Sequence, residues 1–239
     1  MFIIRLVRNL LNFFDFFQQK KIIKFFKSNI LDNLIFIDIG SHHGETVKLF
    51  AKNFKIKECH CFEASPINYK ILLENINKKN LIFKYELNNL GIGEENETTF
   101  INQTEESSSS TINEFNINSK YLKKKLKILN INKSEKFYKK IPIKLITLDE
   151  YIFKKQIKKI DILKIDTEGF ELNVLKGLKL NYKFVKFIYF EHHYDDMIKK
   201  NYKFKDINEL LIKYRFKKIY KSKMYFRKSF EYIYVNTNI

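Results

Sequence analysis

Four short apolar segments, each ending in a carboxylate, a glycine or both, constrain the fold of this chain more than any other feature. They are residues 34–44 (LIFIDIGSHHG), 61–64 (CFEA), 160–169 (IDILKIDTEG) and 187–193 (FIYFEHH). Runs of β-branched and aromatic residues of this length are typical of strands buried on both faces. In an open parallel sheet, ligands bind outside the carboxyl ends of the strands. The pattern therefore predicts an α/β fold with its functional site at that edge.

Helix and strand patterns alternate along the rest of the chain. We expect strands at residues 34–39, 56–62, 81–87, 97–102, 141–147, 160–165 and 185–190, and helices at 45–52, 66–77, 168–176 and 206–214, with a further helix opening at 148. Residues 88–94 are typical of a turn, and two consecutive strands, 216–224 and 230–235, end the chain. This order predicts a mostly parallel sheet with an antiparallel C-terminal strand pair.

At 239 residues the chain suits one α/β domain with an added arm. We expect a helical arm at residues 1–32 and a main domain at 33–239, with residues 103–140 as an insertion or lid. This insertion starts near a serine run at 107–110 and continues through the lysine-rich residues 120–127, without a clear strand period. Long segments of this kind are typically functional loops or disordered.

The N-terminal 30 residues are apolar but carry charges throughout, including Arg5, Arg8 and Asp15. An uncharged apolar stretch of about 18 residues is missing, so a membrane span is not expected, and neither is a signal peptide. The pattern favours one or two amphipathic helices. Their apolar face contains Leu6, Leu10, Phe13, Phe14 and Phe17. We expect this face to pack on the domain or on a second subunit of a homo-oligomer; contact with a membrane surface through residues 1–30 is the alternative.

Charge and cysteine content bear on the partners and the compartment. A net charge of +18 is typical of proteins that bind nucleic acid, anionic membranes or acidic substrates. The lysine-rich, tryptophan-free composition also indicates that part of this charge fills ordinary solvated positions. Cys59 and Cys61 are two residues apart on an expected strand, so they share a face and make a poor disulfide. Two small buried thiols favour a reducing cytoplasm.

The first segment contains a loop suited to a ligand. Asp38, Gly40 and Gly44 lie at a strand-to-helix turn, where glycine admits a close backbone approach and the helix start offers free N–H groups. His42 occupies the place of the second glycine of a dinucleotide motif, which is unfavourable for a pyrophosphate. The turn suits a smaller group, such as the methionine end of S-adenosylmethionine. Glu63 ends the second strand, where an acidic side chain accepts ribose hydroxyl protons.

Together these motifs resemble the FkbM-type family of S-adenosylmethionine-dependent methyltransferases. The matching pieces are residues 36–44, 62–66, 91–94, 107–111, 146–151, 160–171 and 174–177, and the resemblance covers about residues 33–193. Its most specific piece is residues 164–169 (KIDTEG). The chain departs from the family at Ser41 and His42, where Ala-Asn is usual, and at Ala64, where Pro is common.

The resemblance implies a Rossmann-like class I methyltransferase fold with a mostly parallel seven-stranded sheet. It also implies S-adenosylmethionine as the cofactor and O-methylation of a hydroxyl, often on a sugar or a natural-product scaffold. The residues expected to bind the cofactor are Asp38, Gly40, Ser41, His42, Gly44, Glu63, Ala64 and Asn89.

O-Methylation requires the acceptor oxygen to be held in line with the methyl group, and a base usually removes its proton. The candidate catalytic residues are Asp166, Glu191 and His193. Asp166 ends a strand expected beside the first strand, and Glu191 and His193 share one face of the following strand. His193 is a candidate base because an unperturbed imidazole titrates near neutral pH, whereas Glu168 is expected to cap or orient the following helix. No metal is assigned, although Asp166, Glu191 and His193 are residue types that also bind metals.

Three functional hypotheses follow. The first is a cytoplasmic, or membrane-peripheral, O-methyltransferase that acts on a sugar, a glycan or a related small molecule. The second is an RNA ribose 2′-O-methyltransferase, which the charge and the lysine-rich residues 120–140 favour, although no recognisable RNA-binding module is appended. The third is a non-catalytic scaffold, which the intact set Asp38, Gly40, Glu63 and Asp166 opposes.

Overall fold

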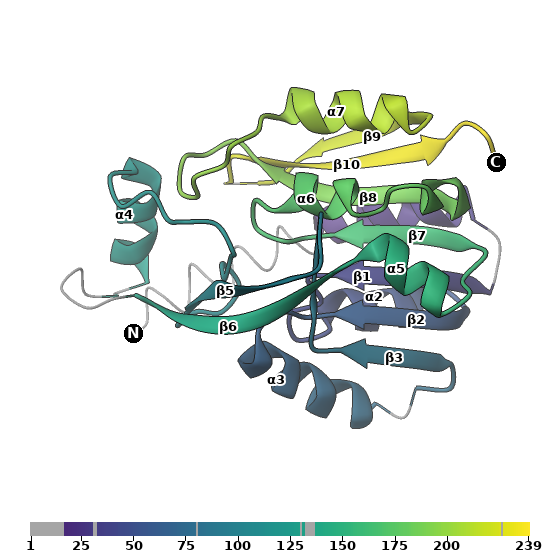
Figure 1. The fold of residues 1–239 in the computed structure, drawn as a ribbon, viewed down its shortest axis with the longest axis horizontal. Helices are drawn as coiled ribbons and strands as arrows, with labels where there is room; N and C mark the ends of the chain where they lie inside the picture. The colour runs from purple at the N-terminus through teal and green to yellow at the C-terminus, as the bar shows by residue number, and fades with distance from the viewer. Residues whose placement is uncertain (1–16, 31–32, 80, 130, 132–136, 226) are drawn as a thin grey trace.

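The computed structural model describes residues 17–30, 33–79, 81–129, 131, 137–225 and 227–239. The strands of its main sheet are β1 (Leu34–Ile39), β2 (Ile56–Phe62), β3 (Lys84–Asn88), β7 (Ile160–Ile165), β8 (Val185–His193), β9 (Phe216–Lys223) and β10 (Ser229–Asn236). Within the described residues these seven strands lie in the order β3-β2-β1-β7-β8-β10-β9 (Figure 1). β3, β2, β1, β7 and β8 are parallel, and β10 is antiparallel to both of its neighbours. The predicted fold class is confirmed.

Helices cover both faces of this sheet (Figure 1). On one face, α2 (Glu45–Asn53), α3 (Pro66–Asn77) and the helical residues 17–27 share a core with Leu34 and Phe36 of β1. On the other face, α5 (Leu148–Lys154), α6 (Glu171–Lys176) and α7 (Phe204–Lys213) share a core with Ile37 and Ile39. Successive side chains of a strand point to opposite faces, so the apolar run of β1 contributes to both cores. A short 3-10 helix, η1 (Asn181–Phe184), precedes β8.

A second sheet contains β4 (Gly91–Gly93), β6 (Tyr138–Thr147) and β5 (Glu97–Thr104), in that order. The prediction of a turn over residues 88–94 is wrong for residues 91–93, because these residues pair in parallel with residues 145–147 of β6. β6 begins at Tyr138 rather than at 141, because residues 138–140 pair with the end of β5.

The lysine-rich part of the predicted irregular segment is a helix, α4 (Lys120–Ile128). Ser119 caps it, since the Ser119 hydroxyl accepts a hydrogen bond from the Leu122 N–H at 3.1 Å. Leu122 and Leu126 share one face of the helix and are buried against Phe115 and Met197, and this burial explains why the segment folds. α4 lies at the left of Figure 1, on the side where the parallel strands end.

Other boundaries also differ from the prediction. α6 begins at Glu171 rather than at 168, because Glu168 and Gly169 have left-handed φ angles of 49° and 94°. β8 continues to His193 rather than ending at 190, because His193 pairs with Ser229 of β10. β3 begins at Lys84 rather than at 81.

In the N-terminal arm, Leu6, Leu10, Phe13 and Phe14 lie outside the described residues. Residues 17–27 pack on the domain, with Phe26 fully buried, and Cys59 and Cys61 are buried free thiols. Of the helices in the described ranges, none has both the length and the apolar character needed to cross a membrane.

Candidate functional site

The turn after β1 is held against its neighbours by main-chain contacts. The N–H groups of Gly40 and Ser41 both donate to the Phe62 carbonyl oxygen, at 2.9 and 3.0 Å. On the other side, the Asp166 N–H donates to the Ile39 carbonyl oxygen at 2.9 Å. Gly40 has a φ of +80°, and a Cβ there would lie 1.8 Å from the Asp166 carbonyl oxygen. Only glycine allows this approach.

Glu63 holds the loop of residues 40–44, which the sequence predicts to bind the cofactor and which we call the cofactor loop. Its carboxylate accepts the N–H of His42 at 2.8 Å and the N–H of Ser65 at 2.9 Å. Burial raises the pKa of Glu63 to about 7, although both main-chain hydrogen bonds oppose that rise. The Asn89 side-chain amide donates to the carbonyl oxygens of Glu63 and Ala64, at 2.9 and 3.2 Å. Asn89 therefore supports the main chain at Glu63 and Ala64.

His42 joins the loop to the insertion. Its Nε2 lies 2.7 Å from the Ser107 hydroxyl, and its Nδ1 lies 3.2 Å from Glu45 Oε1. Of the described residues, His42, His43 and Glu45 form a trio whose ligand atoms lie within 4.8 Å of one another. The two imidazole rings are stacked, with centroids 3.6 Å apart. Because ring lone pairs lie in the ring planes, stacked rings direct them in parallel rather than toward one ion.

A buried lysine connects the ends of β1 and β7. Lys164 is the register partner of Asp38, and its Nζ lies 3.6 Å from Asp38 Oδ1 and 3.1 Å from Asp166 Oδ2. Burial lowers the pKa of Lys164, but Asp166 and Asp38 outweigh it and hold that pKa above its usual range. Burial raises the pKa of Asp166, but Lys164 outweighs it and holds that pKa below its usual range. Asp166 is therefore ionised at neutral pH.

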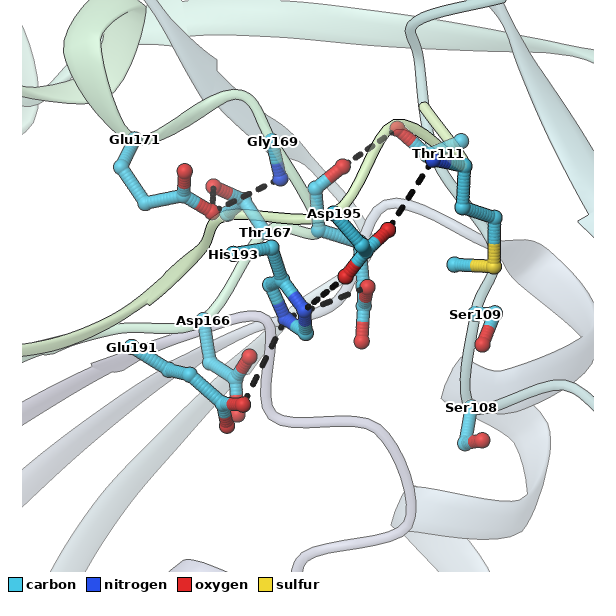
Figure 2. Close-up of polar contacts among 12 residues, drawn as sticks. Ser108, Ser109, Thr111, Asp166, Thr167, Gly169, Glu171, Glu191, His193 and Asp195 are labelled. Carbon is cyan, nitrogen blue, oxygen red and sulfur yellow. Dashed lines mark hydrogen bonds and ion pairs between the residues drawn. The ribbon is translucent and has the colours of Figure 1, made fainter. Parts of the chain in front are cut away.

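His193 lies among three carboxylates at the ends of β7 and β8 (Figure 2). Its Nε2 is 3.5 Å from Glu168 Oε2 and 3.5 Å from Glu191 Oε1, and its Nδ1 is 3.6 Å from Asp195 Oδ2. Burial alone lowers the pKa of His193, but Glu168 and Glu191 outweigh burial and raise that pKa to about 10. His193 is therefore an imidazolium at neutral pH.

Glu168 is the member of this cluster that sequence reasoning assigned to another role. It does not cap α6, whose N-cap is Phe170. Instead it lies on the turn between β7 and α6 with 18% of its side chain exposed, and burial raises its pKa to about 7. The sequence did contain a signal that Glu168 lies at the site. Glu168 comes two residues after Asp166 and immediately before Gly169, and a glycine there permits a turn before the helix.

Side chains from two other segments hold this turn. The Thr111 hydroxyl donates to the Glu168 carbonyl oxygen at 2.8 Å, and the Asn113 amide donates to the Gly169 carbonyl oxygen at 2.6 Å. The Gly169 N–H donates to Glu171 Oε1 at 2.9 Å. Figure 2 shows Thr111 on one side of the turn and Glu171 on the other. The insertion thus contacts the turn that carries Glu168.

Comparisons with known proteins agree with this architecture. A family model described as the methyltransferase FkbM domain matches residues 38–218. The structure is similar to that of M. capricolum TrmK in complex with S-adenosyl-homocysteine, with a TM-score of 0.52 and 16% identity over 93% of this chain and 68% of that one. It is also similar to a methyltransferase FkbM from Methylobacillus flagellatus KT, with a TM-score of 0.54 and 16% identity over 87% of this chain. This chain spans 46% of that protein's length. A comparison with curated proteins finds no match.

Proposed function

The chain belongs to the FkbM methyltransferase family, and from this premise we propose that it methylates a hydroxyl group of a sugar, a glycan or a related small molecule. The protein is a methyltransferase, and its methyl donor is S-adenosylmethionine. The observation that carries the proposed acceptor class is a group of four carboxylates at this edge: Glu168, Glu191 and Asp195 around His193, and Asp166 beside Lys164.

The residues at the end of β1 fit the cofactor. Both carboxylate oxygens of Asp38 are buried and accept no hydrogen bond from the described residues, so they are available to a donor group. α2 begins after Gly44 and has no side-chain cap within the described chain, and free N–H groups at a helix start suit a carboxylate. Each oxygen of Glu63 accepts one N–H, which leaves lone pairs for ribose hydroxyls. Asp38, the loop 40–44 and Glu63 would hold the cofactor.

S-Adenosylmethionine supplies, when bound, a methyl group activated by a sulfonium. The protein's own residues must then hold the acceptor and take its proton. The Asp166 side chain is 35% exposed and kept ionised by Lys164, so it can accept a hydrogen bond from an acceptor hydroxyl. Glu191 and His193 lie at the same edge with 12% of each side chain exposed. In this proposal these three residues orient the acceptor.

The sign of the charge favours a hydroxyl-rich acceptor without phosphates at the reacting position. Four carboxylates at this edge face the cations Lys164 and His193, with Lys125 also facing Glu168 from α4. Carboxylates accept hydrogen bonds from hydroxyl groups. A phosphate placed among them would be repelled, since like charges brought together cost several kcal/mol at an interface. Sugar hydroxyls are uncharged, so the carboxylates do not repel them.

A ribose 2′-O-methyltransferase acting on RNA is the second candidate. One observation favours it: α4, on the side where the parallel strands end, exposes Lys120, Lys123, Lys124 and Lys127. Basic helices of this kind contact phosphate backbones. The acidic reacting edge opposes this candidate, because the ribose to be methylated lies between two phosphates.

The test begins with calorimetric titration of S-adenosylmethionine and S-adenosylhomocysteine into the full chain and into Glu63→Ala. The exposed Glu97→Ala variant is the control. We expect binding that Glu63→Ala weakens at least about tenfold, which is about 1.4 kcal/mol. Methyl transfer is then measured with methyl glycosides, nucleotide sugars and an RNA oligonucleotide as acceptors. Transfer to RNA alone would replace the leading candidate with the second, and a folded protein that binds neither cofactor form would contradict both.

Other sequence-based expectations remain predictions. They are a cytoplasmic location, contact with a membrane surface through residues 1–30, homo-oligomer formation, and a lid role for residues 103–140. Limited proteolysis with and without S-adenosylmethionine tests the last of these, because a lid that closes over the cofactor becomes protected.

A further inference from the structure

We propose that Glu168 is the catalytic base that removes the proton of the acceptor hydroxyl, and that His193 is a positioning residue beside it. This inference rests on the proposed function and deepens it. The acceptor O–H bond breaks and its proton passes to the Glu168 carboxylate. The acceptor oxygen forms a bond to the methyl carbon, and the methyl–sulfur bond breaks with its electron pair left on the sulfur of S-adenosylhomocysteine.

The position of Glu168 is the first argument. It lies two residues beyond Asp166, on the turn that follows β7, and β7 is the neighbour of the cofactor strand β1. Its φ of 49° is in the left-handed region, which is costly for a non-glycine residue. Strain of this kind persists where surrounding contacts hold it, and it gathers at functional sites. Here Thr111 and Asn113 supply those contacts through the carbonyl oxygens of residues 168 and 169.

The unpaired atoms are the second argument. Glu168 Oε2 is buried and accepts no hydrogen bond within the described part of the chain. Asp195, with only 3% of its side chain exposed, faces His193 Nδ1 through an oxygen that likewise lacks a hydrogen bond among those residues. His193 is thus fixed between anions on both sides of its ring. A cation held in this way cannot accept a proton, whereas the Glu168 carboxylate has free lone pairs.

The charges facing Glu168 make it suitable as a base at neutral pH. His193 and Glu191 face it from β8, Lys125 faces it from α4, and Asp166 faces it from its own segment. Burial raises the pKa of Glu168 to about 7, while His193 and Lys125 limit the rise. A base is most effective when its pKa lies near the working pH. Burial, the two facing carboxylates and the two cations together set that condition.

The first test compares Glu168→Gln with the surface control Glu114→Gln in the full chain. Calorimetry should give an S-adenosylmethionine Kd within threefold of wild type for both variants, because neither residue touches the proposed cofactor loop. For the best methyl glycoside found, Glu168→Gln should lower kcat at least about 100-fold, with KM within threefold. A kcat within fivefold of wild type would overturn the proposal.

The second test needs no acceptor. The carboxyl carbon of Glu168 is assigned in a ¹³C NMR spectrum of glutamate-labelled protein by its absence from Glu168→Gln, and is then titrated. We expect a midpoint near pH 7 that moves upward in His193→Gln. A midpoint at or below about pH 5, close to that of an ordinary glutamate, would overturn the proposal whatever the acceptor. Protein that binds the cofactor but methylates no sugar instead contradicts the proposed acceptor class.

Discussion

The site has two halves at one edge of the sheet: the ends of β1 and β2, which we propose bind the cofactor, and the ends of β7 and β8, which we propose bind the acceptor. Each half contains a buried glutamate whose pKa is raised to about 7, yet the two residues are held differently. At the cofactor half, Glu63 accepts two main-chain N–H groups, one to each oxygen. At the acceptor half, Glu168 Oε2 accepts none from the described residues and faces His193 at 3.5 Å. The first carboxylate fixes a loop through satisfied hydrogen bonds. The second lies beside a cation without accepting a hydrogen bond from the described residues, an arrangement that is typical of functional sites.

The largest expected difference between the two halves concerns their glycines. Gly40→Ala should lower the free energy of unfolding by about 3 kcal/mol, because its Cβ would lie 1.8 Å from a main-chain oxygen of Asp166. Gly169→Ala should cost about 1–2 kcal/mol, because its Cβ would meet side chains of Ile198, Asn113 and Lys200 at 3.2–3.3 Å. Urea unfolding measures both. Equal losses would show that the main chain at Gly40 relaxes as easily as side chains do.

The next difference concerns cofactor affinity. Glu63→Gln puts an amide NH₂ in place of one acceptor oxygen, so one of the N–H groups of His42 and Ser65 loses its partner. An unsatisfied buried donor costs about 1–3 kcal/mol, and we expect the Kd for S-adenosylmethionine to rise about 30-fold, which is about 2 kcal/mol. Glu168→Gln, the matched change at the other half, should leave this Kd within threefold. If Glu168→Gln weakened the cofactor as much, the division into two halves would fail.

The pH dependence of kcat in His193→Gln tests how the acceptor half differs from the cofactor half. In wild type, His193 lowers the pKa of Glu168 against the rise that burial causes. Removal of this cation raises the pKa of Glu168 above 7, so less carboxylate is present at neutral pH. We expect a kcat about fivefold lower at pH 7 for a pKa rise of about one unit, and recovery toward the wild-type rate by about pH 9. A loss of activity that is constant from pH 6 to pH 9 would assign His193 a different role.

The geometry of the cofactor half was largely predictable from sequence because local signals mark its positions. Gly40 and Gly44 mark the turn, the apolar run before Glu63 marks a strand end, and the parallel pairing of β1 with β2 brings them together. The acceptor half was predictable only in part. Asp166, Glu191 and His193 follow from strand ends, but the pKa of His193 depends on Glu168 and Asp195, which come from different segments.

The regions that sequence reasoning missed share a physical cause, which is that distant contacts decide their structure. α4 forms because Leu122 and Leu126 pack on Phe115 and Met197, and Met197 lies far along the chain. β4 forms because Gly91 and Gly93 pair with β6, although glycine is a poor strand former. The left-handed Glu168 is held by Thr111. No local pattern encodes such contacts.

The smallest expected effect concerns the hydrogen bond from Thr111 to the Glu168 carbonyl oxygen. Thr111→Val keeps the shape of the side chain but removes the hydroxyl, which donates to the Glu168 carbonyl oxygen and accepts the Asn113 N–H at 3.2 Å. Loss of these two hydrogen bonds should lower the free energy of unfolding by about 1–2 kcal/mol. If the Thr111 hydroxyl positions Glu168, kcat should also fall about threefold, as expected for about 0.6 kcal/mol of transition-state binding. The S-adenosylmethionine Kd should stay unchanged. Thr98→Val, on an exposed position of β5, is the control. A change in Kd without a change in kcat would place Thr111 with the cofactor half and would show that Thr111 does not position Glu168.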